Sequence, residues 1–543
     1  MSHLIKIAWL LMAMLLFAVG CSKDVAPAVN GTSPESPIST ARNSSGVKTA
    51  KSIDEQPGNI YYEIFVRSYA DSNGDGIGDL NGVTSKLDYL KDLGIGGIWL
   101  MPINPSPSYH GYDVTDYYGI NSQYGTLEDM KKLLDEAHKR KIKVIMDLVV
   151  NHTSSKHPWF ISSAEGVGSP YRNWYTWAGA DDKMPGDGAA GAKPWHSLNG
   201  SNYLGIFWDG MPDLNFDNLD VRKEMVKVGQ FWLKQGMDGF RLDAAKHIYG
   251  DFNSTQSTPE TVKKNQAWWQ EFRAGMNEVN KDAYIIGEVW DSPVVIAPYL
   301  DKFNSSFNFD LAKKLITAAD SEKAEDVAFF LSRIYELYAK SSNGTFIDAP
   351  FLSNHDQNRV MSELKGNMDH AKMAAAILLT LPGNPFIYYG EEIGMKGVKP
   401  DEYLREPMIW NEDGKSGSGQ TTWEASRYNK DDAPSVEIQL KDTNSLLNHY
   451  KKMIQWRNEE DALRNGGIGK YMTGNGSVTT FIRATDKQKL LVVHNFSGKE
   501  QTIDLGEDKE NGAFKEVKLF TQKGWKMDGN KLTVPAYTTV ILN

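Results

Sequence analysis

Three carboxylates each follow a strand-like run of the sequence, and their spacing could bring them together. Asp243 lies in MDGFRLDAAKH, Glu288 in AYIIGEVW and Asp356 in APFLSNHDQNR, separated by 45 residues (243 to 288) and 68 residues (288 to 356). Successive strand and helix units of a parallel barrel have such spacing, and barrel enzymes gather catalytic residues at the C-terminal ends of their strands. Two acids at close range are what hydrolysis of a glycosidic bond with retention requires, one as nucleophile and one as proton donor.

The alternative for each acid is a structural role, as a cap of the following helix or as the partner of a nearby arginine. The neighbouring residues favour a catalytic role. Arg241 lies two positions before Asp243, so on an extended strand both side chains point to one face, and the cation favours the ionised carboxylate of a nucleophile. His355 directly precedes Asp356, and His152 ends another strand-like run, KVIMDLVVNH. Together these four segments predict a single site.

These segments resemble the signature regions of the α-amylase family of glycoside hydrolases, and the resemblance runs from about Gly58 to the C-terminus. Four of the regions are similar to DLVVNH at 147–152, GFRLDAAKH at 239–247, GEVW at 287–290 and NHD at 354–356. MPDLN at 211–215 resembles a fifth region, which is typical of a subgroup between oligo-1,6-glucosidases and neopullulanases.

The resemblance implies a role for each acid. Asp243 would be the nucleophile, Glu288 the general acid/base and Asp356 the third acid. A carboxylate near the sugar lowers the barrier to an oxocarbenium-like transition state without forming a bond, which suits Asp356. Glu288 lies between two like charges that raise the pKa of a carboxyl group, so it is the better proton donor.

Other matching residues would bind the sugar. The resemblance implies that the cleavage subsite is formed by His152, Arg241, His355 and Tyr112, the last as a stacking platform within HGYDVTDYY at 110–118. A core position between strand and loop is the alternative for Tyr112. Lys246 and His247 resemble a pair that contacts sugars on the leaving-group side.

Composition limits the classes of partner. The chain has 543 residues, with 41% hydrophobic residues, 59 basic and 69 acidic side chains and a net charge of −10, which argues against nucleic acid. Fifteen Trp and 24 Tyr fit a protein that stacks rings on sugar faces, although most aromatic residues of any fold are core residues. The resemblance implies an α-glucan polysaccharide or oligosaccharide as the substrate, and we expect a monomer.

The N-terminus predicts a targeting signal. An apolar run from Ile7 to Val19 is too short for a permanent membrane span and leads to Gly20 and Cys21. Residues 1–21 resemble a bacterial lipoprotein signal in which Cys21 is lipidated. This predicts an extracytoplasmic protein anchored to the cell membrane, and an ordinary secretory signal is the alternative. Cys21 is the only cysteine, so no internal disulfide can form, and the Ser- and Pro-rich segment 22–56 reads as a flexible tether.

Alternating strand and helix patterns follow, with eight strand candidates between Asn59 and Gly390, among them SSFNFDL at 305–311. Helical stretches between them include 127–141, 221–236 and 368–381. They predict an α/β fold, a (β/α)₈ barrel made of residues 57–151 and 208–463. The segment 152–207 breaks the pattern with Trp, Gly, Pro and Asp, and resembles the family's small B domain, inserted after the third strand. Short alternating runs in 464–543 predict a C-terminal all-β sandwich.

A loop after the first strand, DSNGDGIGDL at 71–80, has the oxygen donors of a calcium site. The expected ligands are Asp71, Asn73, Asp75, the Ile77 carbonyl and Asp79, with Gly76 for the turn. Gly82 replaces the glutamate at the twelfth position of an EF-hand, so the loop is not an EF-hand. It resembles a calcium site of family relatives, and a turn without metal is the alternative.

The sequence as a whole predicts a retaining, endo-acting α-amylase that cleaves α-1,4 bonds of starch and maltodextrins. Two alternatives stay open. An oligo-1,6-glucosidase or a transglycosylase would use the same three acids, because transfer differs from hydrolysis only in the acceptor. A starch-capturing lipoprotein with this fold but without activity is the other, since fold alone does not establish function.

Overall fold

Strands with alternating side chains form a closed parallel barrel. Its seven-stranded sheet has the order β10-β1-β2-β3-β7-β8-β9. The strands are β1 Tyr61–Ile64, β2 Gly97–Leu100, β3 Lys143–Leu148, β7 Gly239–Leu242, β8 Tyr284–Gly287, β9 Ser305–Ser306 and β10 Phe386–Tyr388. Parallel bridges from Phe307 to Ala349 and from Phe351 to Phe386 join β9 to β10 through residues 349–351. The ring therefore has eight members, as the sequence predicts, and the seventh is present only as these two bridges.

These features come from a computed structural model, which describes residues 58–179, 184, 188–249, 258–412, 419–429, 435–506 and 514–543. The predicted signal, Cys21 and the predicted tether lie outside this range. The described residues belong to one compact unit. Within them, none of the helices combines the length and the apolar character that crossing a membrane would need.

The side chains that point into the barrel change from apolar to polar along the barrel axis. At the N-terminal end, Tyr61 stacks on Tyr284 and on Phe386, with ring centroids 5.1 and 5.0 Å apart. Two residues later on β1 comes Glu63, in register with Trp99 of β2. Because alternate strand residues share a face, an apolar floor is followed by polar side chains at the C-terminal rim.

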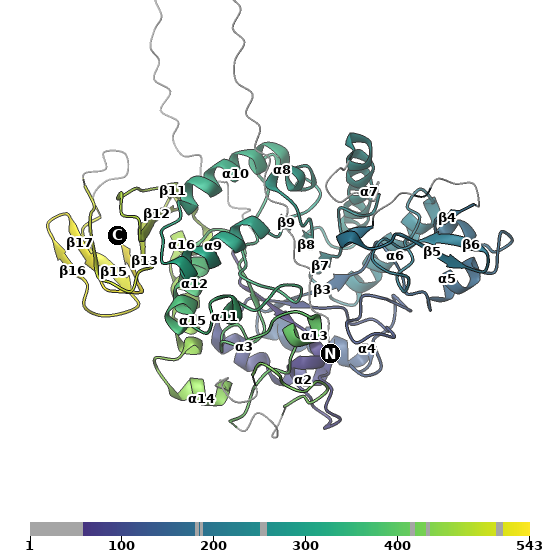
Figure 1. Ribbon diagram of the computed structural model, residues 1–543, viewed down its shortest axis with the longest axis horizontal. Helices are drawn as coiled ribbons and strands as arrows, with labels where there is room; N and C mark the ends of the chain where they lie inside the picture. Colours follow the sequence, from purple (N-terminus) through teal and green to yellow (C-terminus); the bar gives the residue numbers. More distant parts are fainter. Residues whose placement is uncertain are drawn as a thin grey trace, which may run out of the picture. The chain divides into compact units, whose positions relative to one another are not determined.

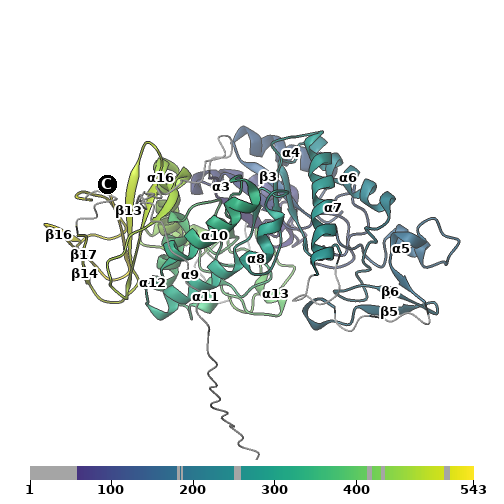
Figure 2. The same cartoon turned by 90° about the horizontal axis from the view of Figure 1, so that it is seen from above.

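Helices cover the outside of the strands (Figures 1 and 2). The longer ones are α4 Leu127–Lys139, α6 Leu219–Lys234, α7 Pro259–Asn277, α9 Phe309–Ser321, α10 Val327–Ser342, α12 Met368–Thr380 and α15 Leu446–Glu459. The shorter ones are α1 Val66–Tyr69, α2 Leu80–Ser85, α3 Leu87–Leu93, α8 Pro293–Ile296, α11 Val360–Glu363, α13 Asp401–Leu404, α14 Val436–Lys441 and α16 Asp461–Asn465.

Local signals explain where these helices begin. Thr126 and Asp129 form a capping box at the start of α4, and each supplies a side-chain acceptor to the other's backbone N–H. α12 is apolar around most of its circumference and is almost entirely buried. α6 and α7 lie side by side, as Figure 2 shows, and elsewhere on the barrel α12 contacts both α9 and α15. The helices predicted at 127–141, 221–236 and 368–381 are thus present, with ends shifted by a few residues.

The segment between β3 and β7 has a small sheet of its own. It contains α5 Pro158–Ser163 and an antiparallel sheet of β4 Trp177–Ala178, β6 Ser201–Leu204 and β5 Trp195–Leu198, in that order. The outgoing and returning chains run beside each other, because the Thr153 amide donates to Pro212 and the Leu214 amide donates to Asn151. The insertion is therefore anchored at the C-terminal end of β3, beside the expected site.

The C-terminal residues form two sheets. β11 Gly467–Lys470, β12 Val478–Ala484, β13 Lys489–Asn495, β18 Thr538–Leu542 and β15 Val517–Phe520 make one sheet, in this order. β14 Gln501–Asp504, β17 Lys531–Val534 and β16 Lys526–Asp528 make the other. A common apolar core includes Leu491 and Val540 of the first sheet and Leu532 of the second, so the sheets face each other.

Candidate active site

The three predicted acids meet at the C-terminal rim of the barrel. Asp243 directly follows β7, Glu288 directly follows β8, and Asp356 follows the bridging residues 349–351. Asp243 and Glu288 are 2.7 and 2.9 Å from the two terminal nitrogens of a single guanidinium group, that of Arg241. The strands thus bring together side chains that are far apart in sequence, as the spacing predicts.

Arg241 is the centre of this arrangement. It lies on β7 with 1% of its surface exposed, and its Nη1 also donates to Asp147 Oδ1 of β3 at 2.8 Å. Asp147 and Arg241 are register partners on adjacent strands. Because the guanidinium is planar and always charged, its contacts with three carboxylates fix their positions and oppose their protonation.

The turn after Asp243 holds Glu288 a second time. Ala244 has φ of 47°, in the left-handed region that costs a non-glycine residue about 1 kcal/mol or more. In this conformation its N–H donates to Glu288 Oε2 at 2.8 Å, and the Ala245 N–H donates to the Glu288 carbonyl at 3.0 Å. Both oxygens of the Glu288 carboxylate are therefore oriented by β7 and its turn.

His355 connects Asp356 to the barrel interior. Its Nε2 is 2.9 Å from Asp356 Oδ2, and its Nδ1 is 2.6 Å from Glu63 Oε1 of β1. On the other side of Asp356, Arg405 Nη2 is 3.1 Å from Oδ1. Asp356 thus has a basic partner at each oxygen, and Arg405 also reaches Asp401 at 3.3 Å.

Tyr112 lies at the centre, while His152 lies behind it. The Tyr112 ring is stacked on His355 with centroids 5.6 Å apart, and its hydroxyl donates to Asp147 Oδ2 at 3.0 Å. His152 is buried, its Nε2 is 3.1 Å from the Tyr112 carbonyl, and its ring lies 5.3 Å from Phe207. His152 therefore supports the loop of Tyr112, and its predicted contact with sugar stays a prediction.

Lys246 and His247 follow the same turn, but their contacts differ. Lys246 Nζ donates to the Trp290 carbonyl at 2.8 Å and lies 3.0 Å from Asp291 Oδ2, so it joins the loops after β7 and β8. His247 is partly buried with its ring 5.8 Å from Phe207. Trp290 is 45% exposed, and its ring is stacked on Phe309 with centroids 4.5 Å apart.

Two residues of this site are not predicted by the motifs. Glu63 carries a signal that could have identified it, since a carboxylate stands within the buried apolar strand YYEI. Arg405 has no such local signal. It follows the short helix α13, 49 residues after its partner Asp356.

The predicted calcium loop is held by its own side chains. Asp71 Oδ1 accepts from the Asn73 and Gly74 amides, and Asp79 Oδ1 accepts from the Gly82 amide at the start of α2. Asp75 and Asn73 also accept amide hydrogen bonds within the loop.

All the expected metal ligands of this loop are oxygen atoms, which calcium prefers. Across the described residues, however, no group of three or more His, Cys, Asp or Glu side chains is arranged to hold a metal ion. Calcium binding therefore stays a prediction.

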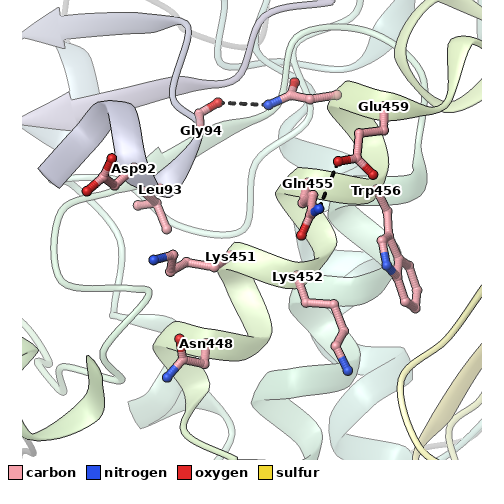
Figure 3. Close-up of a pocket in the computed structure, with 10 residues that line it drawn as sticks. Asp92, Leu93, Gly94, Asn448, Lys451, Lys452, Gln455, Trp456 and Glu459 are labelled. Atoms are coloured by element: carbon pink, nitrogen blue, oxygen red, sulfur yellow. Dashed lines mark hydrogen bonds between the residues drawn. The ribbon is translucent and has the colours of Figure 1, made fainter. Parts of the chain in front are cut away.

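A surface pocket on the outside of the barrel has a different character (Figure 3). It lies between α3 and α15 and is lined by residues such as Asp92, Lys451 and Trp456. Asn458 Nδ2 donates to the Gly94 carbonyl across it, a bond drawn in Figure 3. None of its lining residues belongs to the predicted site, and the contacts join two outer helices.

Comparison with known proteins places this geometry in a family. The family description "Alpha amylase, catalytic domain" matches residues 63–466, and "Alpha-amylase SusG C-terminal domain" matches residues 478–541. Alpha-amylase 3 of Dictyoglomus thermophilum is 46% identical over 484 residues, which cover 89% of this chain and 92% of that protein. An oligo-1,6-glucosidase of Parageobacillus thermoglucosidasius is 33% identical, covering 82% of this chain and 91% of that protein.

A solved structure agrees with these relatives. The crystal structure of an alpha-amylase from H. orenii superposes with a TM-score of 0.82 at 46% identity, covering 90% of this chain and 99% of that one. The catalytic family match spans the barrel, its insertion and all three acids. The chain therefore belongs to the α-amylase family of glycoside hydrolases.

Proposed function

We propose that the chain is a retaining, endo-acting α-amylase that hydrolyses α-1,4-glucosidic bonds of starch and maltodextrins. The observation that carries this proposal is the shared contact of Asp243 and Glu288 with the guanidinium of Arg241. Two carboxyl groups on one guanidinium lie close together, which fits the separation of about 5 to 5.5 Å in retaining enzymes better than the wider spacing of inverting ones.

Asp243 would be the nucleophile. Burial raises the pKa of its carboxyl group, and the Arg241 guanidinium opposes that rise. The ion pair holds the carboxylate ionised at the rim, where it can attack the anomeric carbon and form the glycosyl-enzyme. The bond to the leaving sugar breaks in the same step.

Glu288 would be the general acid and base. Burial raises the pKa of its carboxyl group, and the like charges of Asp243 and Asp356 raise it further, against Arg241. A protonated Glu288 can donate its proton to the leaving oxygen, and the resulting carboxylate can then take a proton from the attacking water.

Asp356 would stay ionised throughout. Although burial acts to raise the pKa of this carboxyl group, His355 and Arg405 lower it below its ordinary range. The opposite shifts of Glu288 and Asp356 assign different roles to two carboxyl groups of one site. A permanent anion beside the sugar stabilises the positive charge that develops on the ring.

Two observations support the proposed cleavage of α-1,4 rather than α-1,6 bonds: the identity to relatives and the residues on the leaving-group side of the site. The alpha-amylase relative is 46% identical, against 33% for the oligo-1,6-glucosidase. Lys246, His247 and the exposed ring of Trp290 follow the strands of the two catalytic acids, where a longer chain would extend past the cleaved bond.

Product analysis tests this proposal. Chromatography after incubation with starch, pullulan and isomaltose should give short maltooligosaccharides from starch early in the reaction. Glucose alone, together with cleavage of isomaltose, would support the oligo-1,6-glucosidase instead, and no product from any of the three would support a binding protein. Proton NMR should show the α-anomer first, because retention preserves the configuration.

We also propose that the loop at 71–79 binds calcium as a structural ion. Oxygen donors at Asp71, Asn73, Asp75, Asp79 and the Ile77 carbonyl support it. Removing calcium with a chelator should lower the melting temperature more than it lowers activity at moderate temperature. Asp75→Ala should blunt this response. Unchanged melting of protein shown beforehand to be metal-loaded would contradict the proposal.

The location of the protein is proposed from the signal alone. We propose a monomer tethered to the cell membrane through lipidated Cys21, which would let the enzyme act outside the cytoplasm. Detergent phase partition of wild type and Cys21→Ser would test the anchor, and light scattering of the purified protein would test the monomer. Equal partition of both proteins would indicate an ordinary secretory signal.

A further inference from the structure

The side chain of His355 lies between two carboxylates. Its Nδ1 is 2.6 Å from Glu63 Oε1, and its Nε2 is 2.9 Å from Asp356 Oδ2. A neutral imidazole carries one N–H and one lone pair, so one of its nitrogens would present a lone pair to a carboxylate. Only an imidazolium donates to both neighbours.

The remaining neighbours do not remove this requirement. Tyr112 Oη is 2.7 Å from Nε2, but the hydroxyl hydrogen already has an acceptor in Asp147. The Trp99 ring packs edge-on against the imidazole at 5.6 Å, and its N–H makes no hydrogen bond to His355 among the described residues. The charged and titratable groups around His355 are Glu63 of β1, Tyr112, Asp147 of β3, Arg241 and Asp243 of β7, Asp356 and Arg405.

The rigid position of Glu63 on β1 brings its side chain to His355. It has 1% of its surface exposed, and its backbone is fixed by register with Trp99 and Tyr388 on the strands at either side. Its side chain reaches His355 across 292 residues of sequence. A buried carboxylate in a rigid strand costs stability unless a partner compensates its charge, and the imidazolium is that partner.

We propose that Glu63 is a positioning residue that keeps His355 as an imidazolium, whose Nε2 lies 2.9 Å from Asp356 Oδ2 and 2.7 Å from the Tyr112 hydroxyl. The proposal rests on the proposed function only for its kinetic readout, because the protonation of His355 can be measured without substrate. Glu63 touches neither the acids nor the expected sugar position in these contacts, so it would act through His355.

The positive charge of a protonated His355 changes the balance of charges in the active site. Arg241 pairs with Asp147, and a protonated His355 pairs with Glu63. Arg241 also pairs with Asp243, and Arg405 pairs with both Asp356 and Asp401. Even with Glu288 protonated, these carboxylates outnumber the cations, which favours the positive charge of an oxocarbenium-like ring. A neutral His355 would leave one more negative charge uncompensated, which raises the pKa of every acid in the site.

The pKa shifts of His355 and Glu63 agree with this geometry. Burial alone would lower the pKa of His355, but Asp356 and Glu63 together raise it to about 10. Burial raises the pKa of Glu63, and His355 opposes the rise. Removing the charge of Glu63 should therefore lower the pKa of His355 towards the operating range of the enzyme.

The direct test is the protonation of His355 in Glu63→Gln. The amide oxygen of Gln can still accept the Nδ1 hydrogen, so shape is preserved and only the charge is lost. Nitrogen-15 NMR of histidine-labelled protein, assigned by the signal lost in His355→Asn, should show wild-type His355 with both nitrogens protonated at pH 8. In Glu63→Gln the titration midpoint should fall by about three pH units, from about 10 to about 7.

Glu392→Gln is the matched control. Glu392 is also buried near the rim, but its carboxylate accepts from Tyr62 and Tyr89 at 2.7 Å. This variant should change the melting temperature without moving the titration of His355. Neutral His355 in wild type at pH 8, or the same midpoint in Glu63→Gln as in wild type, would overturn the proposal even if the enzyme proved to cleave another bond.

Kinetics give the functional readout. The alkaline limb of kcat/KM should move to lower pH in Glu63→Gln, so that the variant loses about tenfold at pH 8 but less than about threefold at pH 5.5, where His355 is protonated in both proteins. An equal loss at both pH values would indicate that Glu63 has only a structural role and would overturn the proposal.

Discussion

Two regions of this protein hold buried guanidinium groups with different kinds of partner. In the active site, Arg241 contacts three carboxylates. At the contact between the barrel and the C-terminal sheets, Arg457 of α15 and Arg483 of β12 are fully buried and bind backbone carbonyls.

These carbonyls lie at a helix end. Arg457 Nη1 donates to the Leu379 carbonyl at 3.1 Å, and Arg483 Nη1 donates to the Thr380 carbonyl, where α12 ends. The last carbonyls of a helix have no partner inside the helix and carry its negative dipole end, so they attract cations. The same side chain thus organises reactive acids in one region and caps a helix in the other.

This difference predicts which substitutions lower the activity and which lower the stability of the protein. At the rim of the barrel, the charge of Arg241 is compensated by carboxylates, and the reaction requires such groups to gain and lose protons. The charges of Arg457 and Arg483 are compensated by carbonyl dipoles, so these residues contribute only to packing. Substitutions in the two regions should therefore separate the rate of turnover from the free energy of unfolding.

The largest effect is expected from Asp243→Asn. Without a carboxylate the glycosyl-enzyme cannot form, so kcat should fall by about 10⁴-fold or more while the melting temperature changes little. Asp486→Asn, at an exposed position in the C-terminal part of the chain, is the matched control and should keep wild-type kcat. Substantial turnover by Asp243→Asn on starch would exclude Asp243 as the nucleophile.

A stability effect is expected from Arg483→Met. Three carbonyls, of Thr380, Gly466 and Gly467, would lose their donor inside the protein, which should lower the free energy of unfolding by about 3 kcal/mol. At 25 °C, kcat should stay within about twofold of wild type. Urea unfolding and starch assays measure the two quantities.

Arg333→Met is the control for this substitution. Arg333 is largely exposed on α10 and pairs with Glu336, so its loss should cost about 0.5 kcal/mol or less. If Arg483→Met lost kcat at constant stability, the proposed separation of the two regions would be wrong.

An effect that depends on pH is expected at Glu391. This carboxyl group is buried and accepts a hydrogen bond from Tyr450, and burial raises its pKa from the ordinary 4.5 to about 8 against the opposing effects of Tyr450 and Arg359. The folded protein keeps the proton up to about pH 8, whereas the unfolded chain releases it near 4.5. Stability from this group is therefore full below pH 4.5 and falls as the pH rises to 8.

Glu391→Gln should remove that contribution to the slope, which is at most about 1.4 kcal/mol per pH unit. Urea unfolding at pH 5, 6.5 and 8 compares the two proteins. Parallel stability profiles would show that Glu391 ionises normally in the folded protein.

The smallest effect is expected from Lys246→Ala. Because Lys246 fixes the carbonyl of Trp290, its loss should weaken cleavage of long maltooligosaccharides by a few fold and leave a small aryl glycoside unchanged. Lys264→Ala, which removes an exposed pair with Asp217, is the control and should change neither substrate. Equal loss on both substrates would argue against a role for Lys246 on the leaving-group side.

Much of the fold could be predicted from local patterns. Alternation within strands predicted that Arg241 and Asp243 share a face, and the structure confirms it, because a period of two depends on the backbone alone. The strand predicted around Ser305 and Phe307 is reduced to two residues and a bridge. Apolar residues there predict burial, but how far a ladder extends depends on the neighbouring strands.

Within the active site, the sequence by itself determined which acids are present and at which strand ends they stand. Only the tertiary structure decided their partners. His355 meets Glu63 from 292 residues away, and Arg405 reaches Asp356 from 49 residues away. Closure of the barrel creates these contacts, and no local pattern encodes a distance between segments that meet only when the first and last strands pair. The charge of each acid depends on those contacts, so it too was decided by the fold.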